Sequence, residues 1–210
     1  MVTLPKVIPL FPLPNVVLFP QMPLPLHVFE PRYRRLVTDA QSGSRIIGIS
    51  LLGPGWEADY QGRPVLYDVG CAGTLEQCDP LEQDRYNILL RGVTRFRIVE
   101  EHAGEPYRLA TVEPLVDETG QPEALEAARR QVMAAIGKAA DGPSMLVLKS
   151  ELPHEIFVNA LCQSLPLTPV ERQSLLTCDS LLTRYQRLLE ILDFKVLEQT
   201  YGRGEDEKIH

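Results

Sequence analysis

The sequence has few of the residues that build metal centres and disulfide scaffolds. Its 210 residues include four cysteines and four histidines, scattered without a Cys-x-x-Cys or a His-Glu-x-x-His motif. Four cysteines in a chain of this length are too few for a disulfide framework. The sequence therefore predicts a protein that binds no metal and is not held together by disulfides.

Motifs for ATP hydrolysis and for nucleophilic catalysis are also missing. The chain contains no Gly-x-x-x-x-Gly-Lys-Ser/Thr loop, which cradles phosphates in many ATPases. It contains no Gly-x-Ser-x-Gly, the turn that presents the nucleophile in α/β-hydrolases. We predict that the chain is not an enzyme, has no catalytic residue and needs no cofactor.

Positive charge and long apolar runs are scarce too. The net charge is −7, and neither half carries the broad positive field that is typical of nucleic-acid binding. No 18 consecutive apolar residues occur without charge or proline, and the start lacks the basic region of a secretory signal. These absences argue against a nucleic-acid partner and predict a cytoplasmic protein that spans no membrane.

Proline, by contrast, is abundant near the start, with seven prolines between Val7 and Val37. Proline cannot donate a hydrogen bond inside a sheet, but sheet edges, bulges and strand ends tolerate it. We interpret this stretch as short, kinked strands that wrap around a barrel. A helix is expected to begin at Pro31 and to end at Gly43, with one apolar face made of Tyr33, Leu36, Val37 and Ala40.

The rest of the first half has the pattern of a β-rich fold. Short apolar runs between Gly, Pro and Asp clusters predict strands at 6–10, 24–28, 45–52, 65–77, 86–91, 95–101 and 107–115. Gly92 is expected to reverse the chain between two of them. After Gly92, alternation predicts that Phe96 points into the core while Arg95 and Arg97 face outward.

After residue 120, apolar side chains recur about every 3.6 residues and no longer every second residue. This spacing predicts helices at 122–140 and 154–165, a short element at 145–152, a helix capped by Thr168 and Glu171, and a last helix from Asp179. We therefore expect an α+β fold with a β-rich subdomain at 1–116, a helical subdomain at 121–200 and a flexible tail at 201–210.

Two groups of side chains are candidates for contact with a partner. Trp56, the single tryptophan, shares a loop of about a dozen residues with Tyr60, and there the two either bind a partner or cap the end of the barrel. Arg91, Arg95 and Arg97 surround Phe96 and resemble a small nucleic-acid patch. The alternative is that these arginines are the outer face of a strand, with stems that cover apolar surface.

Several motifs together resemble the N-terminal substrate-binding domain family of Lon proteases. They are the runs 8–14 (IPLFPLP), 29–34 (FEPRYR), 69–75 (VGCAGTL), 90–98 (LRGVTRFRI) and 171–176 (ERQSLL). The resemblance covers residues 5–197 and implies a PUA-like β-barrel with one interrupting helix, followed by a helical bundle. It also implies substrate recognition, and the ATPase and peptidase domains of the full proteases are expected to be missing.

The leading interpretation is a non-catalytic module that binds polypeptide. Its candidate partner-binding residues are Phe29, Glu30, Arg32, Tyr33, Trp56 and Tyr60. Two alternatives stay open: an RNA-binding PUA-like protein that uses Arg91, Arg95 and Arg97, and a small-molecule enzyme that works in a cleft between barrel and bundle. The sequence fixes neither the partner's identity nor the oligomeric state.

Overall fold

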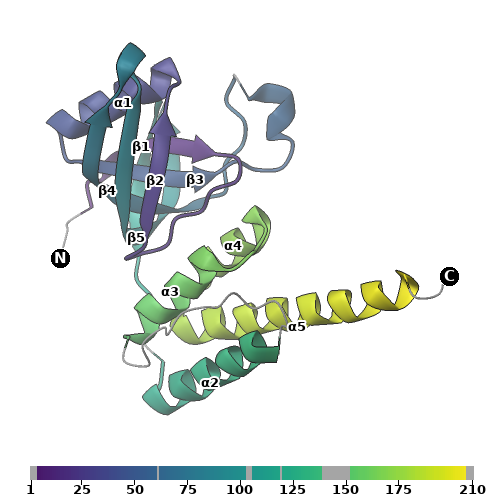
Figure 1. Cartoon of the computed structure of the whole chain (residues 1–210). Helices are drawn as coiled ribbons and strands as arrows, with labels where there is room; N and C mark the ends of the chain where they lie inside the picture. Colours follow the sequence, from purple (N-terminus) through teal and green to yellow (C-terminus); the bar gives the residue numbers. More distant parts are fainter. Residues whose placement is uncertain (1–3, 61, 103–105, 119, 139–151, 207–210) are drawn as a thin grey trace. The chain divides into compact units, whose positions relative to one another are not determined.

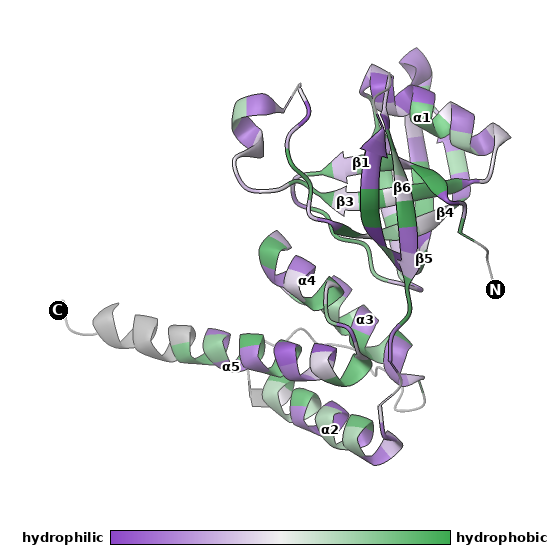
Figure 2. Ribbon diagram, turned by 180° about the vertical axis from the view of Figure 1, so that it is seen from behind, coloured by the Kyte–Doolittle hydropathy of each residue, from purple (hydrophilic) through white to green (hydrophobic). Residues whose placement is uncertain are grey.

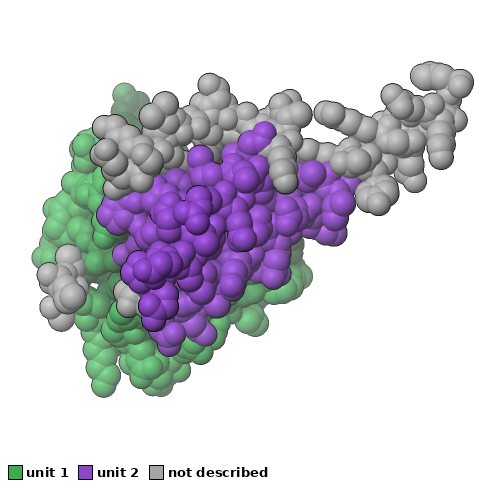
Figure 3. Space-filling view, turned by 90° about the horizontal axis from the view of Figure 1, so that it is seen from below, with its two compact units in different colours: residues 1–116, 159–177 green, residues 117–158, 178–210 purple. Residues whose placement is uncertain are grey.

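The computed structural model describes residues 4–60, 62–102, 106–118, 120–138 and 152–206 (Figure 1). The element predicted at 145–152 therefore lies almost wholly outside the described residues. The chain forms two compact units (Figure 3). The first comprises Met1–Val116 together with Asn159–Thr177, and the second comprises Asp117–Val158 together with Cys178–His210.

The first unit contains a six-stranded sheet in the order β2-β5-β4-β3-β1-β6. The β1–β3 pair is parallel, and the other pairs are antiparallel. Because β5 also pairs with β6, the pairings lead from β5 through β4, β3, β1 and β6 back to β5. The strands are β1 (Val7–Leu13), β2 (Pro23–Val28), β3 (Ile46–Leu51), β4 (Val69–Pro80), β5 (Tyr86–His102) and β6 (Arg108–Leu115).

Strand β1 accommodates prolines because each half of it pairs with a single neighbouring strand. Pro9 lies in the part that pairs with β6, whereas Pro12 lies in the part that pairs with β3. Each proline therefore sits where the strand behaves locally as an edge, so its missing N–H need not break a ladder. The proline-rich start is part of the sheet.

Gly92 does not reverse the chain, contrary to the prediction, because β5 runs through it without a break. The register between β4 and β5 shifts beside Gly73, which pairs with Gly92, as at a β-bulge. A Cβ on Gly92 would clash with the carbonyl oxygen of Phe19. Gly92 also exchanges backbone hydrogen bonds with Gln21 and Met22, each at 2.9 Å. The glycine thus allows the segment before β2 to approach β5 closely.

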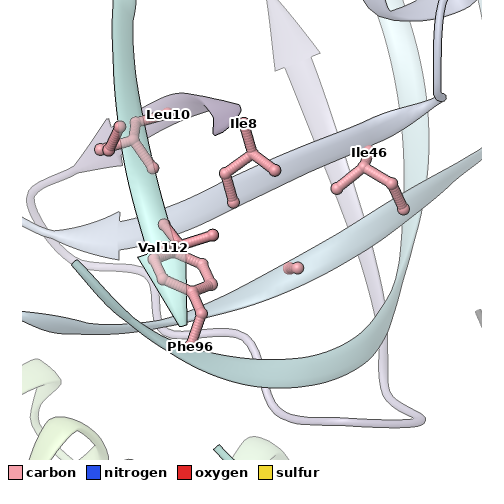
Figure 4. Packing of buried hydrophobic residues seen from close by; sticks show 7 residues of the cluster. Ile8, Leu10, Ile46, Phe96 and Val112 are labelled. Carbon is pink, nitrogen blue, oxygen red and sulfur yellow. The ribbon is translucent and has the colours of Figure 1, made fainter. Parts of the chain in front are cut away.

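Helix α1 (Pro31–Ser42) confirms the predicted helix, with Gly43 as its C-cap. Its buried residues are the four that were expected, namely Tyr33, Leu36, Val37 and Ala40. Figure 2 shows hydrophobic and hydrophilic positions interspersed along α1 and the strands. A core cluster packs together among the strands (Figure 4) and consists of Ile8, Leu10, Ile46, Ala72, Phe96, Ala110 and Val112.

Residues 159–177 join the first unit through buried polar side chains. They include the end of α3 (His154–Ser164) and the whole of α4 (Pro169–Leu176). Asn159 Nδ2 donates to the carbonyl oxygen of Pro20 at 3.2 Å, and Gln173 Nε2 donates to that of Val69 at 2.8 Å. Because both amides are buried, these bonds satisfy groups that would otherwise be costly to bury.

The N-terminus of α4 has the predicted capping box. The hydroxyl of Thr168 accepts a hydrogen bond from the backbone N–H of Glu171 at 3.2 Å. In return, the Glu171 carboxylate accepts one from the backbone N–H of Thr168 at 2.6 Å. Two N–H groups without a helical partner are satisfied in this way, which fixes where α4 begins.

The second unit contains α2 (Pro122–Lys138), the start of α3 and α5 (Leu181–Asp206). Helices α2 and α5 pack against each other. The fully buried guanidinium of Arg184 donates to both carboxylate oxygens of Asp117, at 2.7 and 3.1 Å. Helix α5 runs to Asp206, so it covers most of the stretch 201–210 that was predicted to be a flexible tail.

Candidate binding surface

The junction between β2 and α1 carries the first part of the candidate site. β2 ends at Val28 and α1 begins at Pro31, so Phe29 and Glu30 lie between them. Phe29 is 60% exposed. Glu30 is the N-cap of α1 with an extended backbone, but its side chain makes no capping hydrogen bond. Its carboxylate is therefore available to other side chains.

Two side chains use that carboxylate. Tyr60 Oη donates to Glu30 Oε1 at 2.7 Å, and Arg32 Nε donates to Glu30 Oε2 at 3.1 Å. The side chains of Arg32 and Glu30 are 25% and 22% exposed, so the ion pair is partly removed from water. Charge-assisted hydrogen bonds of this kind fix the positions of the groups that make them.

Aromatic rings surround the Arg32 guanidinium. It lies 4.7 Å from the ring centre of Tyr33 and 5.4 Å from that of Tyr60, which are cation–π distances. Tyr33 in turn stacks on Phe11 of β1, with ring centres 4.2 Å apart. Burial raises the pKa of Tyr33 to about 12, although the nearby Arg32 charge acts in the opposite direction. Burial and the hydrogen bond to Glu30 also raise the pKa of Tyr60.

The loop that carries Tyr60 is closed at its base. Gly53 N–H donates to the carbonyl oxygen of Val65 at 2.7 Å. Within the loop lies the 3₁₀ helix η1 (Trp56–Asp59). The half-exposed ring of Trp56 contacts Tyr60 edge-on at 5.6 Å. The loop therefore holds Trp56 beside the Glu30–Arg32 ion pair through Tyr60.

We call the six predicted partner-binding residues the Phe29–Trp56 surface: Phe29, Glu30, Arg32, Tyr33, Trp56 and Tyr60. Contacts link five of them in one continuous set, and Phe29 adjoins that set through its neighbour Glu30. Tyr33 is 5% exposed, so it supports the other residues from beneath. Their role in binding stays a prediction.

Three further exposed residues of β2 lie in line with Phe29 along the chain. Pro23, Pro25 and His27 are all exposed, and they alternate along the strand in phase with Phe29. The ring of His27 lies 6.1 Å from that of Phe29. Because every second residue of a strand faces the same way, the spacing 23, 25, 27 and 29 was the signal that could have found this extension.

The predicted basic patch is not a free positive surface. The prediction that Arg95 faces outward is wrong: its side chain is 2% exposed, and Nη1 donates to the carbonyl oxygen of Leu176 at 2.9 Å. Leu176 is the last residue of α4, and the sequence of β5 carries no sign of this long-range contact. Arg91 pairs with Glu76 at 2.7 Å, and Arg97 lies 3.8 Å from Asp68.

Among the residues that the structure describes, no group of three or more His, Cys, Asp or Glu side chains could hold a metal ion. Over the same residues, no helix combines the length and the apolar character needed to cross a membrane. Burial raises the pKa of the Cys78 thiol.

Solved structures share this fold. The Lon N-terminal domain protein from Xanthomonas campestris has a TM-score of 0.62 and 25% sequence identity, and the match covers 88% of this chain and 97% of that one. The N-terminal domain of Mycobacterium avium complex Lon protease has a TM-score of 0.72 at 13% identity, over 90% and 98% of the two chains. The architecture is thus that of Lon N-terminal domains.

Sequence comparison gives the family. The model of the ATP-dependent protease La (LON) substrate-binding domain matches residues 7–193, and the chain belongs to this family. Lon protease 2 of Desulfotalea psychrophila is 31% identical over 195 residues, which are 89% of this chain and 25% of that protein. The chain spans a quarter or less of the length of the curated Lon proteases that it matches first.

Proposed function

We propose that this protein is a recognition module that binds polypeptide segments through the Phe29–Trp56 surface and performs no catalysis of its own. The observation that carries the proposal is the exposed ring of Phe29 beside an ordered aromatic and ion-pair cluster. Membership of a substrate-binding domain family supports the same class of function.

The surface has physical properties that suit an apolar segment. The charges of Glu30 and Arg32 already neutralise each other, so a ligand's apolar side chains need not displace the hydration of a lone charge. Covering the exposed part of Phe29 would contribute about 1–2 kcal/mol, by scaling the usual value for a buried aromatic side chain. The rings of Trp56 and Tyr60 lose little conformational freedom on binding, because contacts hold them in place.

We further infer that the sheet of the first unit forms a PUA-like β-barrel and that the helices of the second unit form a bundle. The pairings that return to β5 support the barrel, and the packing of α2 on α5 supports the bundle. A barrel would give the Phe29–Trp56 surface a rigid base, which favours binding by a preformed site.

A titration with an unfolded polypeptide tests the proposed function. Trp56 is the single tryptophan in the chain, so its fluorescence reports on the proposed surface when the ligand lacks tryptophan. A permanently unfolded protein with abundant Phe and Leu is a suitable ligand. We expect saturable binding with a Kd of about 1–50 μM, which corresponds to about 6–8 kcal/mol.

Two matched variants identify the binding residues. Phe29→Ala removes an aromatic side chain that is 60% exposed, and Phe194→Ala removes one that is 59% exposed on α5. We expect Phe29→Ala to weaken binding at least about five-fold and Phe194→Ala to change it less than about two-fold. Absence of saturable binding, or equal effects of the two substitutions, would overturn the proposal.

A further inference from the structure

The loop that carries Trp56 also carries carboxylates. Its sequence from Trp56 to Tyr60 reads Trp-Glu-Ala-Asp-Tyr, so Glu57 and Asp59 are interleaved with the two aromatic residues. Both acidic residues are exposed. Over the part of the chain that the structure describes, neither of them forms an ion pair. Two solvated carboxylates therefore belong to the 3₁₀ helix η1, adjacent along the chain to Trp56 and Tyr60.

The nearby arginines use their charges elsewhere or, in the case of Arg63, lack a carboxylate partner among the described residues. The arginines of α1 are each paired with another carboxylate: Arg32 with Glu30, Arg34 with Asp84, and Arg35 with Asp39. Arg63, at the end of the same loop, instead donates to a backbone group, the carbonyl oxygen of His102, at 2.9 Å. The loop therefore has a net charge of −1, from the two negative charges of Glu57 and Asp59 and the positive charge of Arg63. The net charge of the whole chain is −7.

We propose that the polypeptide segment recognised by this surface carries Lys or Arg beside its aromatic or aliphatic residues. The proposal rests on the proposed function and specifies its ligand. A cation of the ligand would be attracted by the two carboxylates and by the ring of Trp56. An acidic ligand would meet like charge, which disfavours the encounter.

Two peptides that differ in flanking charge test the proposal. Both contain the same central Phe and Leu residues and no tryptophan; Lys flanks the centre in one peptide and Glu in the other. Trp56 fluorescence gives the Kd of each. We expect the Lys-flanked peptide to bind about three- to ten-fold more tightly at ~50 mM salt, because exposed charge pairs have modest effects. The ratio should fall below about two-fold at ~500 mM salt, where screening is strong.

Paired variants assign the preference to the loop. Glu57→Gln with Asp59→Asn removes both carboxylate charges, and we expect the preference for Lys to fall at least about two-fold. The control is Glu100→Gln with Glu113→Gln, which removes two exposed carboxylates from β5 and β6 and should leave the preference intact.

The outcomes separate this inference from the proposed function. A Lys preference that salt weakens and the loop variant reduces would support the inference. Equal binding of the two peptides, weakened by Phe29→Ala, would overturn the inference while the proposed function stands. Equal loss of the preference in both charge variants would also overturn it, because a general effect of net charge would explain the result. Binding of neither peptide would overturn both proposals.

Discussion

Replacing Arg95 with methionine would test whether this arginine holds α4 against the sheet. Its side chain is 2% exposed, and its guanidinium donates to the carbonyl oxygen of Leu176, at the C-terminal end of α4. A hydrogen bond that involves a charged group contributes about 1.5–3 kcal/mol, and methionine would also leave the Leu176 carbonyl without this donor. We therefore expect the first unit to lose about 2–3 kcal/mol of its free energy of unfolding.

Urea unfolding followed by Trp56 fluorescence measures this loss, because Trp56 belongs to the first unit. For a denaturant slope of about 2 kcal/mol per molar, the urea midpoint should fall by about 1 M. Arg97→Met is the matched control on the same strand. Its side chain is half-exposed and lies 3.8 Å from Asp68, so its removal should cost no more than about 1 kcal/mol.

An unchanged midpoint in Arg95→Met would refute the structural role given to this residue. An equal fall in Arg95→Met and Arg97→Met would refute it as well, because the difference in burial would then have no consequence. A third result would revive the RNA-binding alternative: unchanged stability together with the loss of salt-dependent retention on RNA.

Three further predictions concern stability. Arg184→Leu should destabilise the second unit by about 3–5 kcal/mol, because Asp117 would lose its buried partner. Urea unfolding followed by far-UV circular dichroism measures this loss, and a loss below ~1 kcal/mol would contradict the prediction. Thr168→Ala should cost about 1 kcal/mol in the same assay through the lost cap of α4, whereas Thr168→Ser should restore most of it. Tyr33→Phe should change how the free energy of unfolding depends on pH. Folding raises the pKa of Tyr33 to about 12, whereas an unfolded tyrosine ionises near ~10. The free energy of unfolding of the wild type therefore falls as pH rises above about 10. The variant should lose less stability between about pH 9 and pH 11, and an identical slope would contradict the assignment.

Local patterns in the sequence were enough to predict several elements of the fold. The apolar spacing of α1 predicted all four of its buried residues, and Pro31 marked its start. The capping box at Thr168 and Glu171 was readable because its residues are three positions apart. In both elements, the interactions that decide the structure lie within a few residues along the chain.

Long-range contacts explain what could not be predicted. Gly92 resembles a turn residue, but its role depends on the backbone of Phe19, which lies far away along the chain. Arg95 alternates with core residues like any outward-facing side chain, and its burial depends on Leu176. Likewise, the proximity of Glu30 to Tyr60 depends on how the loop folds back, so the sequence could name both residues but not the hydrogen bond between them.

The indole N–H resonance of Trp56 offers the most direct test that polypeptide binds at the Phe29–Trp56 surface. A chain with a single tryptophan gives one such signal in a ¹⁵N-labelled sample, so its assignment is unambiguous. When an unfolded polypeptide is added, we predict a saturable shift of this signal that Phe29→Ala weakens. Saturable binding of the polypeptide with an unmoved indole signal would contradict the proposed site.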